Sequence, residues 1–457
     1  MKIPKILEEI AQKLAQNGIK AVIVGGAVRD YFLGLQKSKD IDIEVYNVNS
    51  LEELAELLKE FGSVNLVGKA FGIIKLKTKE EEFDFSLPRT EKKIAKGHKG
   101  FEVHTHKNLS FQEAARRRDF TINAMGYDII TKKFLDPFNG KKDIEAKRLH
   151  IVDTKSFVED PLRVYRAIGF AARFEMELSA KTKELCKIMV ARGDLEELPK
   201  ERIFEEFKKF LLKAKKPSIA LELLRELGII KYFPELQAII GIPQEPSYHA
   251  EGDVWTHTLM VVDEMAKLKS GDERVDVVRL FSALCHDFGK ALTTKKIDGK
   301  WRAFNHDIKG VAPTISFLER LSSDKKLIES VAGFVKYHLR IAQLYKSNAK
   351  AGAIRRLASN IDIKELELLA RADYFGRESS DKKEYFEAGE WILQRAKELN
   401  VLDAPPKPLV QGRDLIALGL EPSPKFKEML EQAYSAQLDG AFSNKEEALE
   451  WLKKANF

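Results

Sequence analysis

The sequence predicts an α+β fold, with a small mixed sheet in an N-terminal head and helices throughout the remainder. Residues 1–130 contain short apolar and alternating stretches typical of strands. Beyond residues 136–153, apolar residues recur at three- and four-residue spacing almost everywhere, which is the period of a buried helix face. At 457 residues the chain is too long for one ordinary core, so roughly two to four domains are expected.

The head is expected to mix strands and helices. AVIVGG (21–26) is a short apolar strand entering a glycine turn, and DIDIEVY (40–46) alternates at strand period. LEELAELLKEFG (51–62) is an amphipathic helix ended by glycine. FGIIKLKT (71–78) and EEFDFSL (81–87) are two further strands separated by a charged turn.

Helical segments dominate the rest of the chain. PLRVYRAIGFAARF (161–174), ERIFEEFKKFLL (201–212) and PSIALELLRELGII (217–230) have helical periodicity. IPQEPSYHA (242–250) interrupts this pattern with two prolines, and DAPPKPL (403–409) is expected to link to a small helical tail. We therefore expect four domains: a head (1–135), a helical neck and body (136–240), a histidine-bearing domain (241–400) and a tail (401–457).

The composition is that of a globular protein, with 44% hydrophobic and 32% charged residues. No apolar run is long enough to span a membrane, and the first residues form a charged amphipathic pattern unlike a signal peptide. Cys186 and Cys285 lie far apart without metal-type spacing, which favours a reducing, cytoplasmic location. Both a monomer and a dimer stay open.

Positive charge is concentrated in one segment of the head. The net charge is +7, and between Arg89 and Asp119 nine Lys/Arg stand against four acidic residues, a local net charge of +5. Such a segment suits a phosphate-rich partner, because contacts from Lys and Arg to phosphates dominate nucleic-acid affinity. A solvated basic loop explains the charge equally well.

Acidic residues occupy every second position of the second predicted strand. Asp40, Asp42 and Glu44 would therefore share one strand face, where they repel one another unless a cation or water intervenes. Asp84 on a later strand supplies a further carboxylate. Paired carboxylates are ligands that Mg²⁺ prefers, and Mg²⁺ often shares its site with substrate phosphates. An exposed edge strand with solvated acids is the alternative.

The Gly25–Gly26 turn, upstream of these acids, favours a phosphoryl-transfer site. Glycines let backbone N–H groups approach a phosphate without side-chain interference. Two metal ions there would activate a hydroxyl and steady a leaving pyrophosphate.

GGAVRDYFLG (25–34) followed by KDIDI (39–43) resembles the active-site motif of the DNA polymerase β superfamily. More narrowly, the chain resembles class II tRNA nucleotidyltransferases, which are the CCA-adding enzymes, and their bacterial poly(A) polymerase relatives. Further motifs match in order over residues 1–215: RRRDFTINAMGYD (116–128), DPFNGKKDIEAKRL (136–149), EDPLRVYRAIGFAARF (159–174) and ERIFEEFKKFL (201–211). The resemblance implies a polymerase β-like head, tRNA as partner, CTP and ATP as substrates, and Mg²⁺.

The resemblance also implies roles for individual residues. The metal-binding and catalytic carboxylates would be Asp40, Asp42 and Asp84. The triphosphate would meet Gly25, Gly26 and Arg29. The ribose and phosphates would be held by Arg118, Asp119 and Asn123.

EDPLR (159–163) has both a structural and a functional interpretation. Asp160 before Pro161 is a good helix start, since Asp caps helices and Pro suits the first turn. Asp160 and Arg163 are also three residues apart, a spacing that puts both on one helix face. In the family that the chain resembles, these residues bond the Watson–Crick edge of the incoming base. Arg166, one turn further along, would assist them.

Five of the nine histidines fall between residues 249 and 338. ALCHDFGK (283–290) places adjacent histidine and aspartate at the end of an apolar helix, which suits a divalent transition metal. The pattern resembles the HD phosphohydrolase superfamily. The resemblance implies that His257, His286, Asp287 and Asp373 form the minimal metal site. It also implies that His306 and His338 are candidates for binding a second metal. His249 is expected to be structural.

An HD domain after polymerase motifs is similar to bacterial multifunctional CCA proteins. This resemblance implies hydrolysis of phosphoesters, of the phosphatase, 2′-nucleotidase or 2′,3′-cyclic phosphodiesterase type. Metal binding without turnover and RNA docking are alternatives for this domain. The tail resembles a segment that grips tRNA in the same enzymes, and plain packing explains its helices equally well.

The sequence thus predicts a CCA-adding tRNA nucleotidyltransferase with a second, metal-dependent hydrolase. An A-adding or CC-adding enzyme and a poly(A) polymerase are alternatives within the family, although GKAFGIIKL (68–76) lacks the arginine-rich stretch of the polymerases. From other classes, the chain could be a hydrolase with an RNA-binding head or a non-catalytic tRNA-binding module. The three aspartates of the head favour catalysis.

Overall fold

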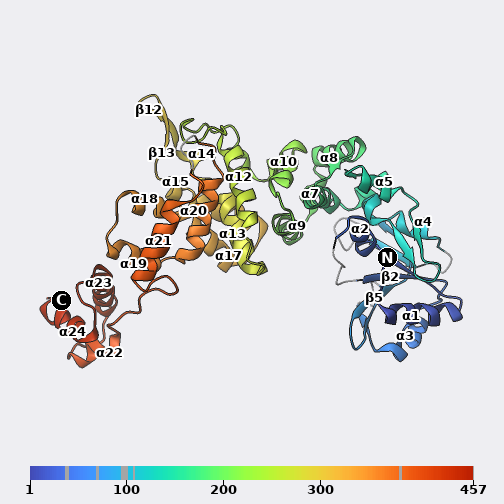
Figure 1. The fold of residues 1–457 in the computed structure, drawn as a ribbon, viewed down its shortest axis with the longest axis horizontal. Helices are drawn as coiled ribbons and strands as arrows, with labels where there is room; N and C mark the ends of the chain where they lie inside the picture. The colour runs from blue at the N-terminus through green and yellow to red at the C-terminus, as the bar shows by residue number, and fades with distance from the viewer. Residues whose placement is uncertain (36–40, 68–71, 94–100, 106–108, 380–382, 456–457) are drawn as a thin grey trace. The chain divides into compact units, whose positions relative to one another are not determined.

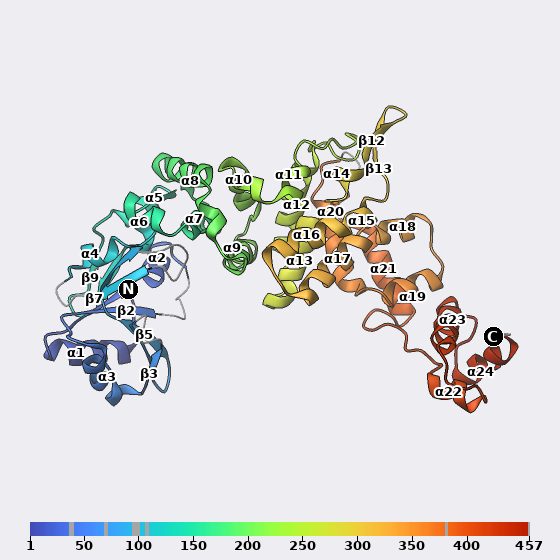
Figure 2. The ribbon, with the colours of Figure 1, turned by 180° about the vertical axis from the view of Figure 1, so that it is seen from behind.

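The computed structural model describes all of the chain except residues 36–40, 68–71, 94–100, 106–108, 380–382 and 456–457 (Figures 1 and 2). The chain forms two compact units: Met1–Ala214 with Ile219–Ile229, and Lys215–Ser218 with Ile230–Phe457. The predicted fold class, a mixed-sheet head followed by helical regions, is confirmed. Among the described residues, no helix is both long and apolar enough to cross a membrane.

A seven-stranded mixed sheet forms the head, in the order β3-β4-β5-β2-β1-β8-β9. Its strands are β1 (Lys20–Val24), β2 (Ile41–Tyr46), β3 (Ser63–Val67), β4 (Ile73–Lys77), β5 (Glu82–Ser86), β8 (Gly126–Asp128) and β9 (Lys133–Leu135). β2 and β5 run parallel, and the other neighbours are antiparallel. Two short pairs stand apart from this sheet: β6 (Arg89–Lys93) with β7 (Phe101–Thr105), and β10 (Arg148–Leu149) with β11 (Glu177–Leu178).

Helices cover both faces of the sheet. α1 (Lys5–Gln16) contacts β1, and α3 (Leu51–Leu58) contacts β4. The two helices also contact each other. On the opposite face, Ala114 of α4 (Phe111–Ala115) packs with Val22, Val24 and Tyr46. The other elements of this unit are α2 (Gly26–Phe32), η1 (Lys59–Phe61), η2 (Thr121–Asn123), α5 (Gly140–Glu145), α6 (Thr154–Glu159), α7 (Leu162–Phe174), α8 (Ala180–Arg192), η3 (Asp194–Glu197), α9 (Lys200–Lys213) and α10 (Ser218–Glu226), of which only Ser218 belongs to the second unit.

Strand register decides which side chains of the head share a face. Asp42 of β2 lies opposite Val24 of β1 and opposite Asp84 of β5. Directly paired residues on neighbouring strands point to the same side of a sheet, so the two carboxylates lie next to each other. Because Val24 ends β1, Asp42 also lies beside the Gly25–Gly26 turn that follows.

Glu44, two residues further along β2, is completely buried on the same face. Its carboxylate accepts hydrogen bonds from Arg117 at 2.8 Å, Arg118 at 3.4 Å and the Tyr46 hydroxyl at 2.7 Å. Burial alone would raise the pKa of Glu44, but the Arg118 and Arg117 charges and the Tyr46 hydroxyl outweigh it and lower that pKa. The acidic strand is therefore neutralised at this position by the protein itself.

Helices build most of the second unit. They are η4 (Ile229–Tyr232), α11 (Pro234–Ala238), α12 (Val254–Lys267), α13 (Glu273–Cys285), α14 (Lys290–Thr293), α15 (His306–Lys309), α16 (Val311–Leu321), α17 (Lys325–Tyr337), α18 (Arg340–Lys346), α19 (Ala351–Ala358), α20 (Ile363–Phe375), α21 (Glu387–Glu398), α22 (Gly412–Ala417), α23 (Lys425–Asp439) and α24 (Lys445–Lys454). A hairpin of β12 (Thr294–Ile297) and β13 (Lys300–Ala303), which helical periodicity did not predict, projects from them (Figure 1).

The tail has its own small core and packs on the rest of the second unit. Leu415, Met429 and Leu452 belong to a buried apolar cluster of α22, α23 and α24. α23 contacts α19, where Arg356 donates a hydrogen bond to Asp439 at 2.5 Å. These contacts account for the tail without any RNA, so its grip on tRNA stays a prediction.

Substituting Glu44→Ala tests whether the ion pairs of Glu44 hold the head together. Removing one partner leaves two arginine charges against a buried face, which costs about 3–5 kcal/mol. We expect the head to unfold at a clearly lower temperature in calorimetry, whereas Glu80→Ala at an exposed site should change stability by no more than about 0.5 kcal/mol.

The pH dependence of the Glu44 contribution has a definite sign. Because the folded pKa is lowered, the contribution is complete above the ordinary carboxyl pKa and is lost only as the pH falls through the lowered value. Equal stability of wild type and Glu44→Ala at neutral pH would contradict this account.

Candidate functional site

The predicted acidic site of the head lies at the end of β1. Asp42 and Asp84 are neighbours across β2 and β5, and Lys75 of β4 is paired with Asp84 on its other side. The Lys75 Nζ lies 3.8 Å from the Asp84 carboxylate, and both side chains are partly exposed. Asp40, the third predicted carboxylate, lies outside the described residues.

The glycine turn leaves room for an arginine. Gly25 has a positive φ of 69°, and a Cβ there would lie 3.0 Å from Nη1 of Arg118. A side chain at this position would be strained and would crowd the guanidinium. Arg118 also donates to the backbone carbonyl of Asn123 at 3.4 Å and to the Glu44 carboxylate. Glu44 therefore orients Arg118, a residue predicted to hold the ribose and phosphates.

Four of the predicted nucleotide-binding residues form one hydrogen-bonded chain. Arg166 of α7 donates two hydrogen bonds to the Asp119 carboxylate at 2.8 and 2.5 Å. Asp119 also accepts from the side-chain Nδ2 of Asn123 at 2.9 Å, and the side-chain Oδ1 of Asn123 accepts from Arg29 at 2.8 Å. The guanidinium groups of Arg29 and Arg166 both lie over the Phe170 ring, at 5.4 and 5.2 Å.

Electrostatics keep this chain ionised. Burial would raise the pKa of Asp119, but the Arg166 charge and the Asn123 hydrogen bond outweigh it and lower that pKa. The pKa of Arg166 is raised, mainly by the Asp119 charge and against its own burial. The arrangement therefore links the Gly25–Gly26 region to α7 through charged groups that stay charged at neutral pH.

The side chains of Asp160 and Arg163 contact other groups, although the Arg163 backbone N–H donates to the Asp160 carbonyl at 3.0 Å. Arg163 donates to the backbone carbonyls of Ser156 at 2.8 Å and Arg117 at 2.5 Å. Asp160 accepts from the backbone N–H of Leu162 at 3.2 Å, as a capping residue does, and lies 3.5 Å from Arg202. Both side chains are partly exposed, so they are accessible to a ligand.

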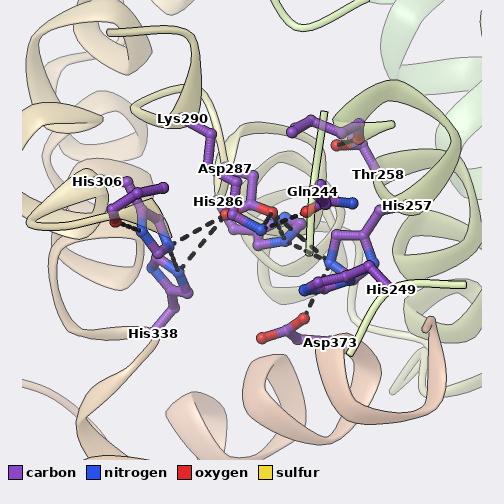
Figure 3. Close-up of polar contacts among 12 residues, drawn as sticks. Gln244, His249, His257, Thr258, His286, Asp287, Lys290, His306, His338 and Asp373 are labelled. Carbon is purple, nitrogen blue, oxygen red and sulfur yellow. Dashed lines mark hydrogen bonds and ion pairs between the residues drawn. The ribbon is translucent and has the colours of Figure 1, made fainter. Parts of the chain in front are cut away.

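In the second unit, all six residues predicted to bind metal converge from separate helices (Figure 3). They are His257 in α12, His286 and Asp287 directly after α13, His306 at the start of α15, His338 directly after α17 and Asp373 in α20. All are buried except Asp373, which is partly exposed. Two groups of three have ligand atoms within 4.8 Å of one another: His257, His286 and Asp373, and Asp287, His306 and His338.

Backbone carbonyls orient three of the four histidines. Nδ1 of His286 lies 2.8 Å from the Ala283 carbonyl, Nδ1 of His306 lies 2.7 Å from that of Ala303, and Nδ1 of His338 lies 2.6 Å from that of Val335. A carbonyl oxygen can only accept, so Nδ1 of each ring carries a proton, and Nε2 presents its lone pair when the ring is neutral.

The Nε2 atoms of the four histidines face one another in two pairs. Nε2 of His286 lies 3.3 Å from Nε2 of His257, and the same distance separates Nε2 of His306 from that of His338. Burial lowers the pKa of His338 to about 3, and the pKa of His306 is lowered too. Neutral imidazoles with converging lone pairs suit a metal cation.

Asp287 stands between the two histidine pairs (Figure 3). Its Oδ1 lies 3.3 Å from Nε2 of His306, and its Oδ2 lies 3.2 Å from Nε2 of His286. Burial would raise the pKa of Asp287, but the His286 and Lys290 charges hold it well below its ordinary value. One carboxylate can therefore serve both groups, a geometry that fits two metal ions.

Two neighbours of these ligands escaped sequence reasoning because neither belongs to the histidine and aspartate pattern. Lys290 is buried, and its Nζ lies 2.7 Å from Asp287 and 2.6 Å from the Gln244 amide oxygen. Its spacing of three from Asp287 on a helical turn was the signal that could have identified it.

Glu251 is the second neighbour of the metal-binding residues that sequence reasoning missed. Its carboxylate is 1% exposed, and Oε1 lies 2.7 Å from Nδ1 of His249 and 3.0 Å from Nδ1 of His257. Nδ1 of His257 is not aligned for a hydrogen bond, so this contact is an ion pair. The Glu378 N–H donates to Oε2 at 2.9 Å. His249, expected to be structural, thus supports the carboxylate behind a predicted ligand.

Carboxylates on both sides of His257 favour positive charge there. Burial would lower the pKa of His257, but Asp373 and Glu251 outweigh it and raise the pKa to about 9. A cation bound at Nε2 would satisfy the same field. The donor set of imidazole nitrogens and carboxylate oxygens therefore fits a divalent transition metal.

Three family models match the chain. The poly(A) polymerase head domain matches residues 21–150, the probable RNA and SrmB-binding site of polymerase A matches 175–240, and the HD domain matches 254–378. The head match includes Asp42 and Asp84, and the HD match includes all six converging ligands.

The chain is similar over most of its length to curated proteins. It is 37% identical over 327 residues to a multifunctional CCA protein of Neisseria meningitidis serogroup A, covering 71% of this chain and 74% of that one. It is 34% identical over 436 residues to a multifunctional CCA protein of Xanthomonas oryzae pv. oryzae, covering 93% and 99%.

Solved structures share the fold. A CCA-adding enzyme of Bacillus stearothermophilus in complex with CTP superposes with a TM-score of 0.71 at 23% identity, over 100% of this chain and 98% of that one. A Thermotoga maritima CCA-adding enzyme complexed with tRNA gives a TM-score of 0.60 at 21% identity, over 99% and 96%.

Substituting Glu251→Gln tests whether this carboxylate supports the histidine site. The loss of charge behind His257 should weaken metal affinity about tenfold, as for other residues that orient ligands from behind. Affinity can be measured from Co²⁺ absorption in competition with a chromophoric chelator. The matched control is Glu378→Gln, which keeps the backbone N–H that Glu251 accepts from. Unchanged affinity in Glu251→Gln would contradict the expectation.

Proposed function

Because this chain belongs to the multifunctional CCA proteins, its head is a CCA-adding tRNA nucleotidyltransferase, and we propose that Asp40, Asp42 and Asp84 hold the Mg²⁺ ions of this reaction. The observation that supports this assignment most directly is the register that sets Asp42 beside Asp84 and next to the Gly25–Gly26 turn. When bound, Mg²⁺ activates the attacking hydroxyl and stabilises the leaving pyrophosphate.

The reaction joins the tRNA 3′-oxygen to the α-phosphorus of CTP or ATP and breaks the bond to the β-phosphate. The backbone of Gly25 and Gly26 would approach the triphosphate, and Arg118, held by Glu44, would offset its charge. Asn123 and Asp119 would meet the ribose, since both are fixed in one chain with Arg29 and Arg166.

Asp160 and Arg163 would select the base. A carboxylate that accepts and a guanidinium that donates can match the Watson–Crick edges of cytosine and adenine without a nucleic-acid template. Arg163 donates to two backbone carbonyls in this structure. It would donate to the base instead when a nucleotide binds, because one neutral acceptor can replace another.

The HD domain would be a metal-dependent phosphohydrolase. The supporting observation is Asp287 standing between two histidine pairs, a donor set for one or two divalent transition metals. When bound, such metals supply a hydroxide nucleophile near neutral pH. Lys290, fixed by Gln244, would place a cation beside the negative charge that develops on the phosphoryl group.

Purified protein with CTP and ATP should extend tRNAs that lack CCA, C75–A76 or A76 alone, each to the complete end. Asp84→Ala should reduce this addition by more than about a hundredfold, because it removes a metal ligand. It should retain hydrolysis of bis-p-nitrophenyl phosphate measured with Mn²⁺, Co²⁺ and Ni²⁺.

Asp287→Ala should behave in the opposite way, keeping addition and losing hydrolysis. Incorporation of neither nucleotide would contradict the head assignment, and loss of both activities in either variant would contradict two separate sites. Extension of the CC-ended tRNA by ATP alone, with CTP inert on every primer, would indicate an A-adding enzyme.

Asp160→Ala should relax base choice rather than stop chemistry. An unpaired polar edge of a bound base costs about 1–3 kcal/mol, so discrimination of CTP and ATP against UTP and GTP should fall by roughly tenfold or more. Single-nucleotide incorporation with each triphosphate measures this ratio. The neighbouring Glu159→Ala serves as the control and should keep wild-type discrimination; equal behaviour of the two variants would contradict the role of Asp160.

A further inference from the structure

A cavity opens directly beside the histidine site. It has a volume of about 480 Å³ and is lined on its inner side by Asp287, His306 and His338. A space of this size suits one nucleotide-sized ligand, since small-molecule pockets usually measure several hundred Å³. The walls further out differ in character from the buried ligand cluster, because they are basic and aromatic.

The β12–β13 hairpin supplies one wall. Trp301 and Arg302 line the cavity. The backbone N–H of Trp301 donates to the Glu245 carboxylate at 3.0 Å, which fixes the hairpin to the loop before α12. The hairpin projects from the helices (Figure 1). Its exposed charged residues are four cations and the single acid Asp298. These cations are Lys295, Lys296, Lys300 and Arg302.

Two aromatic side chains stand exposed at the rim. Phe304 is 66% exposed and Tyr248 is 51% exposed, and both line the cavity. Large aromatic groups usually bury most of their surface, so two exposed rings at the mouth of one cavity indicate a ligand with flat apolar faces. They come from separate segments, since Phe304 follows β13 and Tyr248 precedes α12.

Further cations line the cavity from other elements. Lys346 of α18 and Arg377 after α20 line it together with Lys290. Three of the hairpin cations, Lys295, Lys296 and Lys300, are exposed on the projecting hairpin and do not line the cavity. Positive charge therefore continues outward from the cavity, which a strand with several phosphates would use and a single nucleotide would not.

We propose that this rim is a platform for single-stranded polynucleotide, whose terminal phosphoester enters the metal site. Bases would stack on Phe304 and Tyr248 while phosphates meet Arg302 and the hairpin lysines, as in other proteins that bind single strands through aromatic faces and basic grooves. The inference rests on the proposed hydrolase function and names its substrate class: strand ends rather than free mononucleotides.

The test measures inhibition of bis-p-nitrophenyl phosphate hydrolysis by the full-length protein. An oligoribonucleotide of six residues that carries a 3′-phosphate should inhibit competitively and at lower concentration than a mononucleoside monophosphate. Phe304→Ala should raise the inhibition constant of the oligonucleotide about tenfold, since stacking of one base is worth about 1–3 kcal/mol. Ile308→Ala is the matched control, because Ile308 is 51% exposed nearby and does not line the cavity.

Salt provides a second readout. Inhibition by the oligonucleotide should weaken steeply with KCl, and less steeply in the double variant Lys295→Gln, Lys300→Gln, because fewer counterions are released. The proposal is overturned if the oligonucleotide inhibits no better than the mononucleotide, or if Phe304→Ala and Ile308→Ala behave alike.

Failure of the hydrolase itself is distinguishable from failure of the platform. A protein that hydrolyses no ester with any metal would overturn the proposed hydrolase function. The platform is then tested by ultraviolet cross-linking of a 4-thiouridine oligoribonucleotide, mapped by mass spectrometry. Cross-links in the peptide that contains residues 294–304 are expected, and cross-links confined to residues 1–214 would overturn the platform.

Discussion

Buried carboxylates matched by fixed cations are the interaction on which the structure depends. An isolated charge in the protein interior is very costly, so the buried acids that border the two sites have positively charged partners. Glu44 meets Arg117 and Arg118, Asp119 meets Arg166, and Asp287 meets Lys290. In both units these pairs border the predicted sites, so folding and the placement of reactive groups depend on the same contacts.

The two sites gather their residues by different physical means. In the head, register across β1, β2 and β5 brings Asp42 beside Asp84, because paired residues on adjacent strands share a face. In the HD domain the ligands sit within or at the ends of separate helices, and backbone carbonyls aim three of the rings. A sheet therefore positions neighbouring carboxylates, whereas converging helices surround a metal with nitrogen and oxygen donors from several directions.

Sequence reasoning identified the residues of both sites where a motif gave them local context. It placed Glu44 on one strand face with Asp40 and Asp42, since side chains alternate along a strand, but it did not find the arginine partners of Glu44, which lie more than 70 residues away. It left His249 as structural and did not notice Glu251, because the link between them and His257 arises from the fold of a loop onto a helix. The β12–β13 hairpin is also short enough to be hidden among helical periodicities.

The sequence by itself determined the fold class, the order of the motifs and the residue types available for metal and nucleotide binding, because periodicity and motif spacing are local properties of a chain. Only the tertiary structure decided which charges meet. It paired Arg166 with Asp119 instead of leaving it free for a base, and it set Asp287 between two histidine pairs. Such pairings depend on distances between segments far apart in the chain, which strand register and helix packing alone establish.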